Sequence, residues 1–329
     1  MYLLSLCIPT YNRADYLKES LRSICEQSEF NSTEDIEIII SDNNSSDHTE
    51  SVCKHFVELY GERIKYFKNT TNIEDLNFEH VLSKGSGTLL KLNNDTLIHS
   101  KGSLADILKT IRDNIEKKPV IFFSNGKASS RIIKEFNDID SFLTHISFYC
   151  TWIGGFCIWK DDFYKFDNFS RYASKKLIQT DVLFRLADKK RIFVVNDKVL
   201  CRTVPKINGG YNFLEVFLTN YISILEEGVR ERGISKRVFL NEKSRVLIDH
   251  ICPWVAKSKQ RYKASFDVSE HWNYLFRYFS NDPKAIALYC FGYFRYNVTY
   301  FIVKKKNSLN LSKEEGCIDA INSNMYASF

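Results

Sequence analysis

The stretch LCIPTYNRADYLKESL, residues 6–21, joins an apolar run to an amphipathic helix and sets the pattern for the fold. The apolar run, residues 2–8, predicts a strand buried on both faces. After Arg13, apolar side chains recur at helical spacing, at Leu17, Leu21 and Ile24. A short turn of Gly, Asn or Asp would suffice to connect a strand and a helix. The connection of five residues, PTYNR at 9–13, is therefore longer than a turn requires, and a role as a binding loop would explain its length.

The same order of strand and helix repeats along the N-terminal part of the chain. Strands are predicted at 36–41, 63–67, 88–92 and 120–124, and helices at 52–60, 77–83 and 102–116. This alternation predicts an α/β protein with a mostly parallel sheet and helices on both faces. Ligands of such sheets bind beyond the carboxyl ends of the strands. We expect three polar segments to meet at that edge, because each follows a strand: PTYNR (9–13), SDNNSSD (41–47) and LNNDT (92–96).

The composition is that of a globular protein, since 44% of the 329 residues are hydrophobic and 26% are charged. From about residue 206 the strand signals give way to a helical, aromatic and basic sequence. We therefore predict two domains, 1–205 with the sheet and 206–329 made of helices. The net charge of +6 favours anionic partners, but we find no basic-aromatic motif typical of nucleic-acid binding and expect no nucleic-acid partner.

The nine cysteines form no C-x-x-C pair and no zinc-like cluster, which predicts free thiols in a reducing compartment. The first eight residues lack the basic segment of a signal peptide. Both features favour a cytoplasmic protein.

Three segments in order, residues 8–24, 38–49 and 72–98, resemble glycosyltransferase family 2, most of all its bacterial surface-polysaccharide members related to abequosyltransferase. The resemblance covers about residues 3–100 well, 150–190 loosely and the C-terminal third hardly at all. It implies a GT-A fold in residues 1–205 that binds a nucleoside-diphosphate sugar, with UDP as the expected nucleotide. Residues 206–329 would then serve acceptor or membrane association.

The resemblance also implies which residues bind the donor. Pro9, Thr10, Tyr11, Asn12 and Arg13 would lie against the base and ribose, offering an aromatic face and polar groups. Asp42 would accept the imide N–H of uracil, and NIEDLN implies further donor contacts from Asn72, Asp75 and Asn77. Two alternatives stay open. Thr10 or Asn12 could merely cap the next helix, and residues 42–47 could be a turn in which Asp47 caps the helix near Thr49.

The expected metal motif departs from the family pattern. Family members carry D-x-D or D-D-D after the strand, where this chain has Asn93, Asn94 and Asp95. Hard divalent cations prefer charged oxygen ligands, so two amides weaken the site. The resemblance implies that Asp95 holds Mg²⁺ or Mn²⁺ with the donor diphosphate, while Asn93 or Asn94 donates to the ribose or diphosphate. A polar turn at a strand end is the alternative, and so is an enzyme with weak metal binding.

An inverting transfer needs a base that takes the proton of the acceptor hydroxyl. The segment TWIGGFCIWKDDF, 151–163, resembles the acceptor side of the family, with Trp152, Gly154 and Gly155 as acceptor-side residues. LIQTDVLFRLA, 177–187, places Asp181 at a helix start and in the family order of the base. A helix-capping Asp181 is the alternative, and Asp161 or Asp162 is the second choice for the base.

The segment KAIALYCFGYFRYNVTYFIVKKK, 284–306, contains five basic residues and no acidic one. Arg295 and Asn297 in its middle disfavour a membrane span. An interfacial helix on an anionic membrane fits the pattern, and so does an aromatic helix packed within the protein.

The resemblance, taken together, predicts an inverting glycosyltransferase that adds one sugar to a lipid-linked glycan during bacterial surface polysaccharide assembly, of O-antigen or capsule. It would act in the cytoplasm, at the face of the inner membrane. Two alternatives remain: a nucleotidyltransferase of sugar-nucleotide synthesis, although PTYNR lacks the glycines of a phosphate loop, and a non-catalytic sugar-nucleotide or glycan-binding protein.

Overall fold

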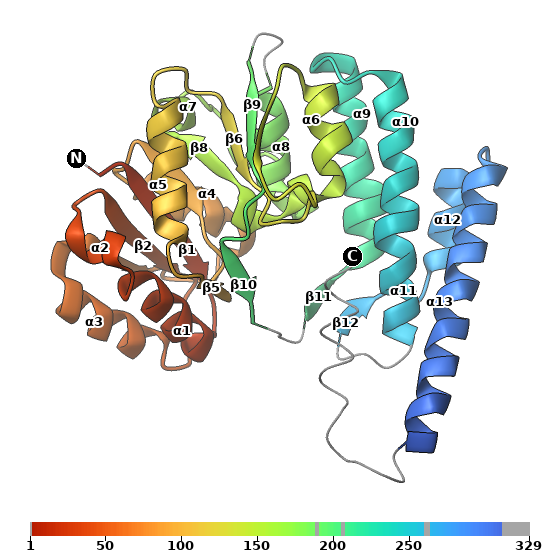
Figure 1. Cartoon of the computed structure of the whole chain (residues 1–329), viewed down its shortest axis with the longest axis horizontal. Coiled ribbons are helices and arrows are strands. Elements are labelled where there is room, and N and C mark those ends of the chain that lie inside the picture. The colour runs from red at the N-terminus through yellow and green to blue at the C-terminus, as the bar shows by residue number, and fades with distance from the viewer. Residues whose placement is uncertain (1, 188–190, 205–207, 260–263, 311–329) are drawn as a thin grey trace. The chain divides into compact units, whose positions relative to one another are not determined.

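The computed structural model describes residues 2–187, 191–204, 208–259 and 264–310 (Figure 1). The chain divides into two compact units. The first combines Met1–Lys206 with Glu215–Val246, and the second combines Ile207–Leu214 with Leu247–Phe329.

A five-stranded sheet in the order β3-β2-β1-β4-β8 is the centre of the first unit. Its strands are β1 (Leu4–Thr10), β2 (Ile36–Asp42), β3 (Ile64–Lys68), β4 (Leu89–Leu92) and β8 (Cys157–Trp159). The first four run parallel, and β8 is antiparallel to β4. The predicted α/β class with a mostly parallel sheet is therefore confirmed, and strand order reverses at β1, between β2 and β4.

Helices cover both faces of this sheet, because its central strands are apolar on both sides. On one face, β1 side chains such as Leu6 and Ile8 pack in a core with the helices α1 (Ala14–Cys25), α3 (Thr49–Tyr60) and α5 (Ser103–Asn114). On the other face, α4 (Asn77–Ser83) packs against β1 and β2. Seven cysteines of the described residues are buried free thiols, and Cys290 is exposed.

Smaller elements complete the first unit. A second sheet has the order β6-β9-β7, and β5 pairs with β10. These strands are β5 (Leu97–His99), β6 (Val120–Phe123), β7 (Ile133–Phe136), β9 (Phe193–Asn196) and β10 (Cys201–Thr203). The remaining helices of the unit are α2 (Ser28–Ser32), α6 (Ile139–Ile146), α7 (Lys160–Phe163), α8 (Ile178–Arg185), α9 (Ile222–Glu231) and α10 (Lys236–Arg245).

The compact units differ from the predicted division at residue 205/206, since α9 and α10 belong to the first unit. Glu242 of α10 is 2% exposed and accepts hydrogen bonds from Ser147, at 2.8 and 3.0 Å, and from Tyr221 at 3.0 Å. A buried carboxylate needs such donors, so α10 is tied to the sheet-bearing part of the chain.

The second unit contains α11 (Cys252–Lys259), α12 (His271–Phe279), α13 (Pro283–Asn310) and two strands, β11 (Asn208–Asn212) and β12 (Ala264–Asp267). The strands pair in parallel, and the sequence pattern did not predict either of them. Within the described ranges, no helix is both long and apolar enough to cross a bilayer.

Candidate active site at the carboxyl edge of the sheet

The three polar segments that follow β1, β2 and β4 meet at one edge of the sheet, as predicted. Thr10 is the register partner of Asp42 at the ends of β1 and β2, and the Thr10 carbonyl accepts from the Asn43 N–H at 2.9 Å. The Asn93 N–H, just after β4, donates to the Cys7 carbonyl at 2.8 Å. Parallel pairing therefore brings residues more than 80 positions apart in sequence into one site.

Asp95 is held by the first of these segments. Its carboxylate is buried and accepts from the Thr10 hydroxyl at 3.0 Å and from the Arg13 guanidinium at 3.1 Å. The Arg13 side chain is 39% exposed, so it joins the buried carboxylate to the surface. Part of the unusual length of PTYNR is thus explained, because both Thr10 and Arg13 reach across to the segment after β4.

Asp42 lies at the end of β2 and is fully buried. One carboxylate oxygen accepts from the Ser45 N–H and the other from the Tyr66 hydroxyl, both at 2.8 Å. Burial, together with the hydrogen bond to Asp42, raises the pKa of Tyr66 well above its usual range, so Tyr66 stays a proton donor. Sequence analysis did not single out Tyr66, although its place on β3 beside β2 could have suggested it.

The PTYNR loop is fastened to the segment after β2. Asn12 adopts a φ of 51°, a left-handed conformation that Asn tolerates, and its side chain accepts from the Ser46 N–H at 2.8 Å. Tyr11 is 45% exposed and presents an aromatic face. Asp47 accepts from the Ala14 N–H at 3.1 Å and from the Thr49 N–H at 3.0 Å, so one carboxylate binds the first backbone N–H of both α1 and α3.

The NIEDLN segment divides into structural and surface residues. Asn77 is 2% exposed and uses its amide within the protein: its oxygen accepts from Ser41 at 2.6 Å, and its nitrogen donates to the Ser41 carbonyl at 3.0 Å. Asn77 therefore fixes the end of β2, and its contact with the donor stays a prediction. Asn72 is exposed and caps a turn at the Glu74 N–H. Asp75 is half-buried, and burial raises its pKa.

Asn93 also has hydrogen-bond partners within the protein. It is fully buried, its oxygen lies 2.8 Å from His99 Nε2, and its nitrogen donates to the Asn94 carbonyl at 3.2 Å. Desolvation lowers the pKa of His99 to about 3, so the ring is neutral. The Asn93 amide thus has partners inside the protein, and its contact with a sugar nucleotide stays a prediction. Asn94 is half-buried beside it and stays a candidate.

The residues of the predicted metal motif form no complete metal site by themselves. Among the residues that the structure describes, no group of three or more His, Cys, Asp or Glu side chains could hold a metal ion. Asp95 is the motif's single carboxylate, and Arg13 already neutralises part of its charge. Divalent cations prefer several charged oxygens, so a cation would bind here only if a ligand such as a diphosphate supplied the remaining oxygens.

The acceptor-side glycines have a packing role. A Cβ on Gly155 would approach the Phe122 ring to 2.4 Å, and one on Gly154 would approach Trp152 to 2.7 Å. The Gly154 carbonyl accepts from the buried Lys91 ammonium at 2.5 Å, which ties this segment to β4. Side chains from both elements line a cavity of about 10 Å³, room for one water molecule and not for a sugar.

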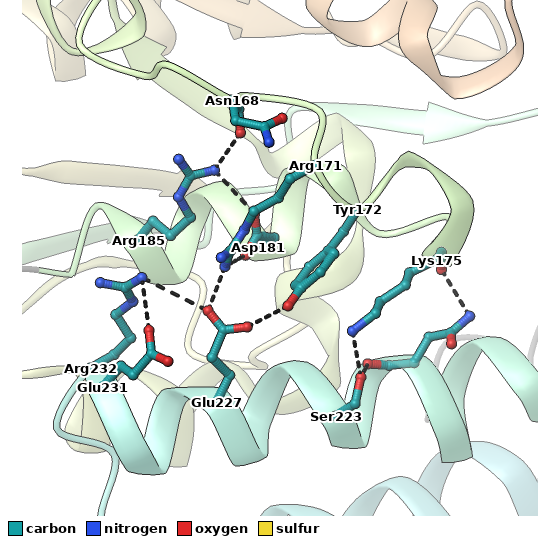
Figure 2. Close-up of polar contacts among 11 residues, drawn as sticks. Asn168, Arg171, Tyr172, Lys175, Asp181, Arg185, Ser223, Glu227, Glu231 and Arg232 are labelled. Carbon is teal, nitrogen blue, oxygen red and sulfur yellow. Dashed lines mark hydrogen bonds and ion pairs between the residues drawn. The ribbon is translucent and has the colours of Figure 1, made fainter.

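Asp181 lies in the first turn of α8 and is 2% exposed (Figure 2). Arg171 binds both of its oxygens, with Nε at 2.9 Å from Oδ2, and Arg185 lies 3.3 Å from Oδ2. Arg171 was not predicted, and only the basic and aromatic run RYASKK, 171–176, hints at it. Charge-assisted hydrogen bonds from two arginines fix the orientation of this carboxylate.

The second choice for the base is wrong. Asp161 and Asp162 follow Trp159, and Trp159 pairs with Leu89, the first residue of β4. Since β8 is antiparallel to β4, both carboxylates lie at the amino edge of the parallel strands, opposite the edge with Asp95. They pair with Lys118 and Arg191 there.

The edge that carries Thr10, Asp42 and Asp95 lies in a part of the chain that is similar to known proteins. Residues 5–116 match the profile of the family described as Glycosyl transferase family 2. This part of the chain is a glycosyl transferase family 2 domain. The predicted resemblance is confirmed, and the matched residues include β1, β2 and β4 with the segments that follow them.

Curated relatives match a part of the chain. Abequosyltransferase RfbV of Salmonella typhimurium is 42% identical over 113 residues, which are 34% of this chain and 33% of that protein. The GalNAc(5)-diNAcBac-PP-undecaprenol beta-1,3-glucosyltransferase of Campylobacter jejuni is 44% identical over 66 residues, 20% of each chain. The chain thus spans a third or less of the length of these relatives.

Solved structures share the fold of the family 2 domain and of most of the chain. TarS 1-349 of S. aureus in complex with UDP has a TM-score of 0.59 and 17% identity and covers 91% of both chains. Mannosyltransferase PcManGT from Pyrobaculum calidifontis in complex with GDP-Man and Mn²⁺ has a TM-score of 0.57 and 14% identity, covering 90% of this chain and 87% of that one. At these identities the likeness shows the fold, which confirms the GT-A-like architecture.

Proposed function

We propose that this protein is an inverting glycosyltransferase that moves one sugar from a UDP-sugar to a lipid-linked glycan in surface polysaccharide assembly. The observation that carries the proposal is the convergence of Thr10, Asp42 and Asp95 at the carboxyl edge of the family 2 domain. The names of the relatives, an abequosyltransferase and an undecaprenol-linked glucosyltransferase, support the surface glycan and the lipid-linked acceptor.

Donor binding uses the edge residues in different ways. Asp42 would accept the imide N–H of uracil, exposed Tyr11 would offer its ring to the base, and Arg13 would face the diphosphate with its exposed guanidinium nitrogens. The hydrogen bond to the buried Asp95 carboxylate keeps Arg13 in place. Asn72, Asp75 and Asn94, which lie at the same edge or beside it, are candidates for further contacts with the donor.

The transfer step needs one proton acceptor. The acceptor hydroxyl oxygen attacks the anomeric carbon, the bond from that carbon to the diphosphate oxygen breaks, and UDP leaves with the electron pair. We assign the hydroxyl proton to the Asp181 carboxylate. Trp152, Gly154 and Gly155 would lie on the acceptor side, joined to α8 because Gln179 donates to the Thr151 carbonyl at 2.6 Å.

A divalent cation would be held by Asp95 together with the donor diphosphate, and it would supply positive charge to the leaving group. Thermal-shift screening with UDP, GDP, CDP and dTDP sugars, with Mn²⁺ or with EDTA, tests donor and metal together. We expect UDP-sugars to stabilise the fold, because a ligand at about 100 times its Kd adds roughly 2.7 kcal/mol. In Asp95→Asn, the part of the shift that depends on Mn²⁺ should vanish.

The two halves of that experiment have separate contrary outcomes. Stabilisation by GDP or dTDP sugars and not by UDP-sugars would contradict the nucleotide assignment. A shift that is the same with Mn²⁺ and EDTA, in both the parent and Asp95→Asn, would remove the metal from the proposal. Asn93→Asp, a change toward the family motif, is not expected to restore metal binding, because this position faces His99 inside the protein.

Two other functions make different predictions. A nucleotidyltransferase would release pyrophosphate from a nucleoside triphosphate and a sugar phosphate, whereas a glycosyltransferase releases UDP from a UDP-sugar. A non-catalytic binding protein would be stabilised by UDP-sugar without releasing UDP. Assaying UDP release with the donor from the screen therefore separates all three.

We further propose that the protein acts in the cytoplasm and contacts an anionic membrane through α13. Exposed apolar residues recur on this helix at spacings of three and four, at Leu288 (44%), Phe291 (67%), Phe294 (69%) and Val298 (39%). Lys284 and Arg295 add positive charge, and lysines follow at 304–306, whose side chains lie outside the described ones. An apolar stripe next to basic residues is typical of helices that lie in the membrane interface.

Co-sedimentation with vesicles of phosphatidylcholine, with and without phosphatidylglycerol, tests the membrane contact. The parent should bind the anionic vesicles, and less so as salt screens the charges. Replacing Lys304, Lys305 and Lys306 by Gln should weaken binding, since each contributes about 1 kcal/mol, and Phe291→Ser with Phe294→Ser should weaken it at every salt concentration. A parent protein that stays in the supernatant at low salt would contradict the proposal.

A further inference from the structure

Arg171 lies between two carboxylates that belong to different helices (Figure 2). It binds Asp181 of α8 through two nitrogens, with Nε at 2.9 Å from Oδ2, and its Nη2 lies 2.6 Å from Oε1 of Glu227 on α9. The exposed fractions of the two acidic side chains are 2% and 10%. We call this arrangement of Asp181, Arg171 and Glu227 the bridged pair.

The second acid of the bridged pair has its own supports. Oε2 of Glu227 accepts from the Tyr172 hydroxyl at 2.5 Å, and Arg232 lies 3.8 Å from Oε1. Burial opposes ionisation of Glu227, but the hydrogen bonds from Tyr172 and Arg171 outweigh it and lower its pKa. Glu227 is therefore a charged partner that keeps hold of Arg171, independently of Asp181.

Other charged groups near Asp181 come from the same elements. Arg185, one turn further along α8, lies 3.3 Å from Asp181 Oδ2 and also donates to the Asn168 carbonyl at 2.8 Å. Lys175 lies 3.7 Å above the Tyr172 ring and donates to Ser223 at 2.9 Å. The charged and titratable groups around Asp181 are thus Arg171, Tyr172 and Lys175 from the segment before α8, Arg185 from α8 itself, and Glu227 from α9.

A carboxylate clamped by arginine is a poor proton acceptor, because the cation favours its charged form. Any group that shares the charge of Arg171 weakens this effect. We propose that Glu227 is a positioning residue for sugar transfer: it shares Arg171 with Asp181, so that Arg171 holds the Asp181 carboxylate in place for the acceptor hydroxyl without pairing with it alone. This inference rests on the proposed function, in which Asp181 is the base.

Opposite substitutions in the bridged pair should have opposite effects on the pH profile. Glu227→Gln leaves Arg171 to Asp181 alone, so the acid limb of kcat/KM should move to lower pH and kcat at the plateau should fall. Arg171→Gln removes the cation and leaves two acids close together, so the acid limb should move to higher pH. An opposite charge at this distance moves such a limb by roughly one pH unit. The measurement is UDP release from the UDP-sugar that the donor screen selects.

Matched variants separate this role from simple structural support. Glu231→Gln changes an acid one turn along α9 that is 51% exposed and pairs with Arg232, so the acid limb should not move. Arg171→Lys keeps the positive charge and should return the limb toward its parental position. Arg171→Gln combined with Glu227→Gln removes both charges, and its limb should lie between those of the single variants.

The outcomes are distinguishable. If both single variants lower the rate at every pH and the limb stays fixed, while Asp181→Asn abolishes transfer, the positioning role of Glu227 is overturned and the proposed function stands. If Asp181→Asn transfers sugar at a near-parental rate, the base assignment and the inference that rests on it are both overturned. Limbs that move in opposite directions support the inference, because a loss of folding cannot produce them.

Discussion

Replacing Asp181 by Asn is expected to lower sugar transfer by about 100-fold or more, the usual contribution of a general base. The amide keeps the shape of the carboxylate but cannot take the proton of the acceptor hydroxyl. Binding of the UDP-sugar should persist, because the predicted base and ribose contacts come from the edge near Asp42 and not from α8. The measurement is the rate of transfer together with the Kd for UDP.

Asp161→Asn is the matched control for this prediction, since Asp161 lies at the opposite edge of the sheet and pairs with Lys118 at the surface. Its transfer rate should equal that of the parent. Asp181→Asn also leaves Arg171 and Arg185 with one carboxylate fewer, and unbalancing a buried ion pair costs about 3–5 kcal/mol. The melting temperature of the variant should therefore be measured first. A folded Asp181→Asn protein with near-parental turnover would contradict the assignment.

Replacing Asp42 by Asn is expected to weaken UDP binding by about 10- to 100-fold, because a hydrogen bond to a charged group is worth about 1.5–3 kcal/mol. Asparagine is the appropriate change, and not alanine. Asp42 is fully buried and both of its oxygens accept bonds from Ser45 and Tyr66, so a truncated side chain would also destabilise the end of β2. The expectation is checked by titration calorimetry with UDP.

A methylated nucleotide makes the same test specific for the imide contact. The uracil N–H is absent from 3-methyl-UDP, so the parent should bind it weakly, and Asp42→Asn should cause little further loss. Such non-additivity is the mark of two groups in direct contact. Equal losses for UDP and 3-methyl-UDP would show that Asp42 acts on the fold of the edge and not on the base. Tyr66→Phe removes one donor to Asp42 and should have a smaller effect than Asp42→Asn.

The local sequence predicted β1 to β4 with α1, α3, α4 and α5, but not β5, β7 or β8, and it predicted the edge at which the polar segments meet. Apolar runs such as 36–41 identify strands, and apolar residues at helical spacing, such as Leu17, Leu21 and Ile24, identify helices. Both patterns can be read from the sequence because the buried face of each element repeats with the period of that element. Parallel strands send their carboxyl ends to one edge, so the meeting of the segments after β1, β2 and β4 also followed. The match to family 2 rests on the same residues.

The tertiary structure alone decided what each polar side chain does there. Asn77 and Asn93 are of a residue type that often binds ligands. In the structure the Asn77 amide bonds to Ser41, and the Asn93 amide bonds to His99 and to the Asn94 carbonyl. Only packing determines which way an amide faces. The sheet topology likewise places Asp161 at the amino edge of the parallel strands, because β8 runs antiparallel to β4. Neither fact can be read from a motif.

The bridged pair depends most on tertiary structure. Asp181 could be named from sequence, whereas Arg171 lies in a loop without a motif and Glu227 is in a helix beyond the predicted domain boundary. Their contact joins residues 56 positions apart. The periodicity of apolar residues in a sequence indicates which side chains are buried. A buried ion pair, in contrast, depends on how two helices lie relative to each other. For this protein, the sequence by itself determined the sheet and the edge at which its polar segments meet, and the packing of α9 within the first unit determined the partners of the proposed base.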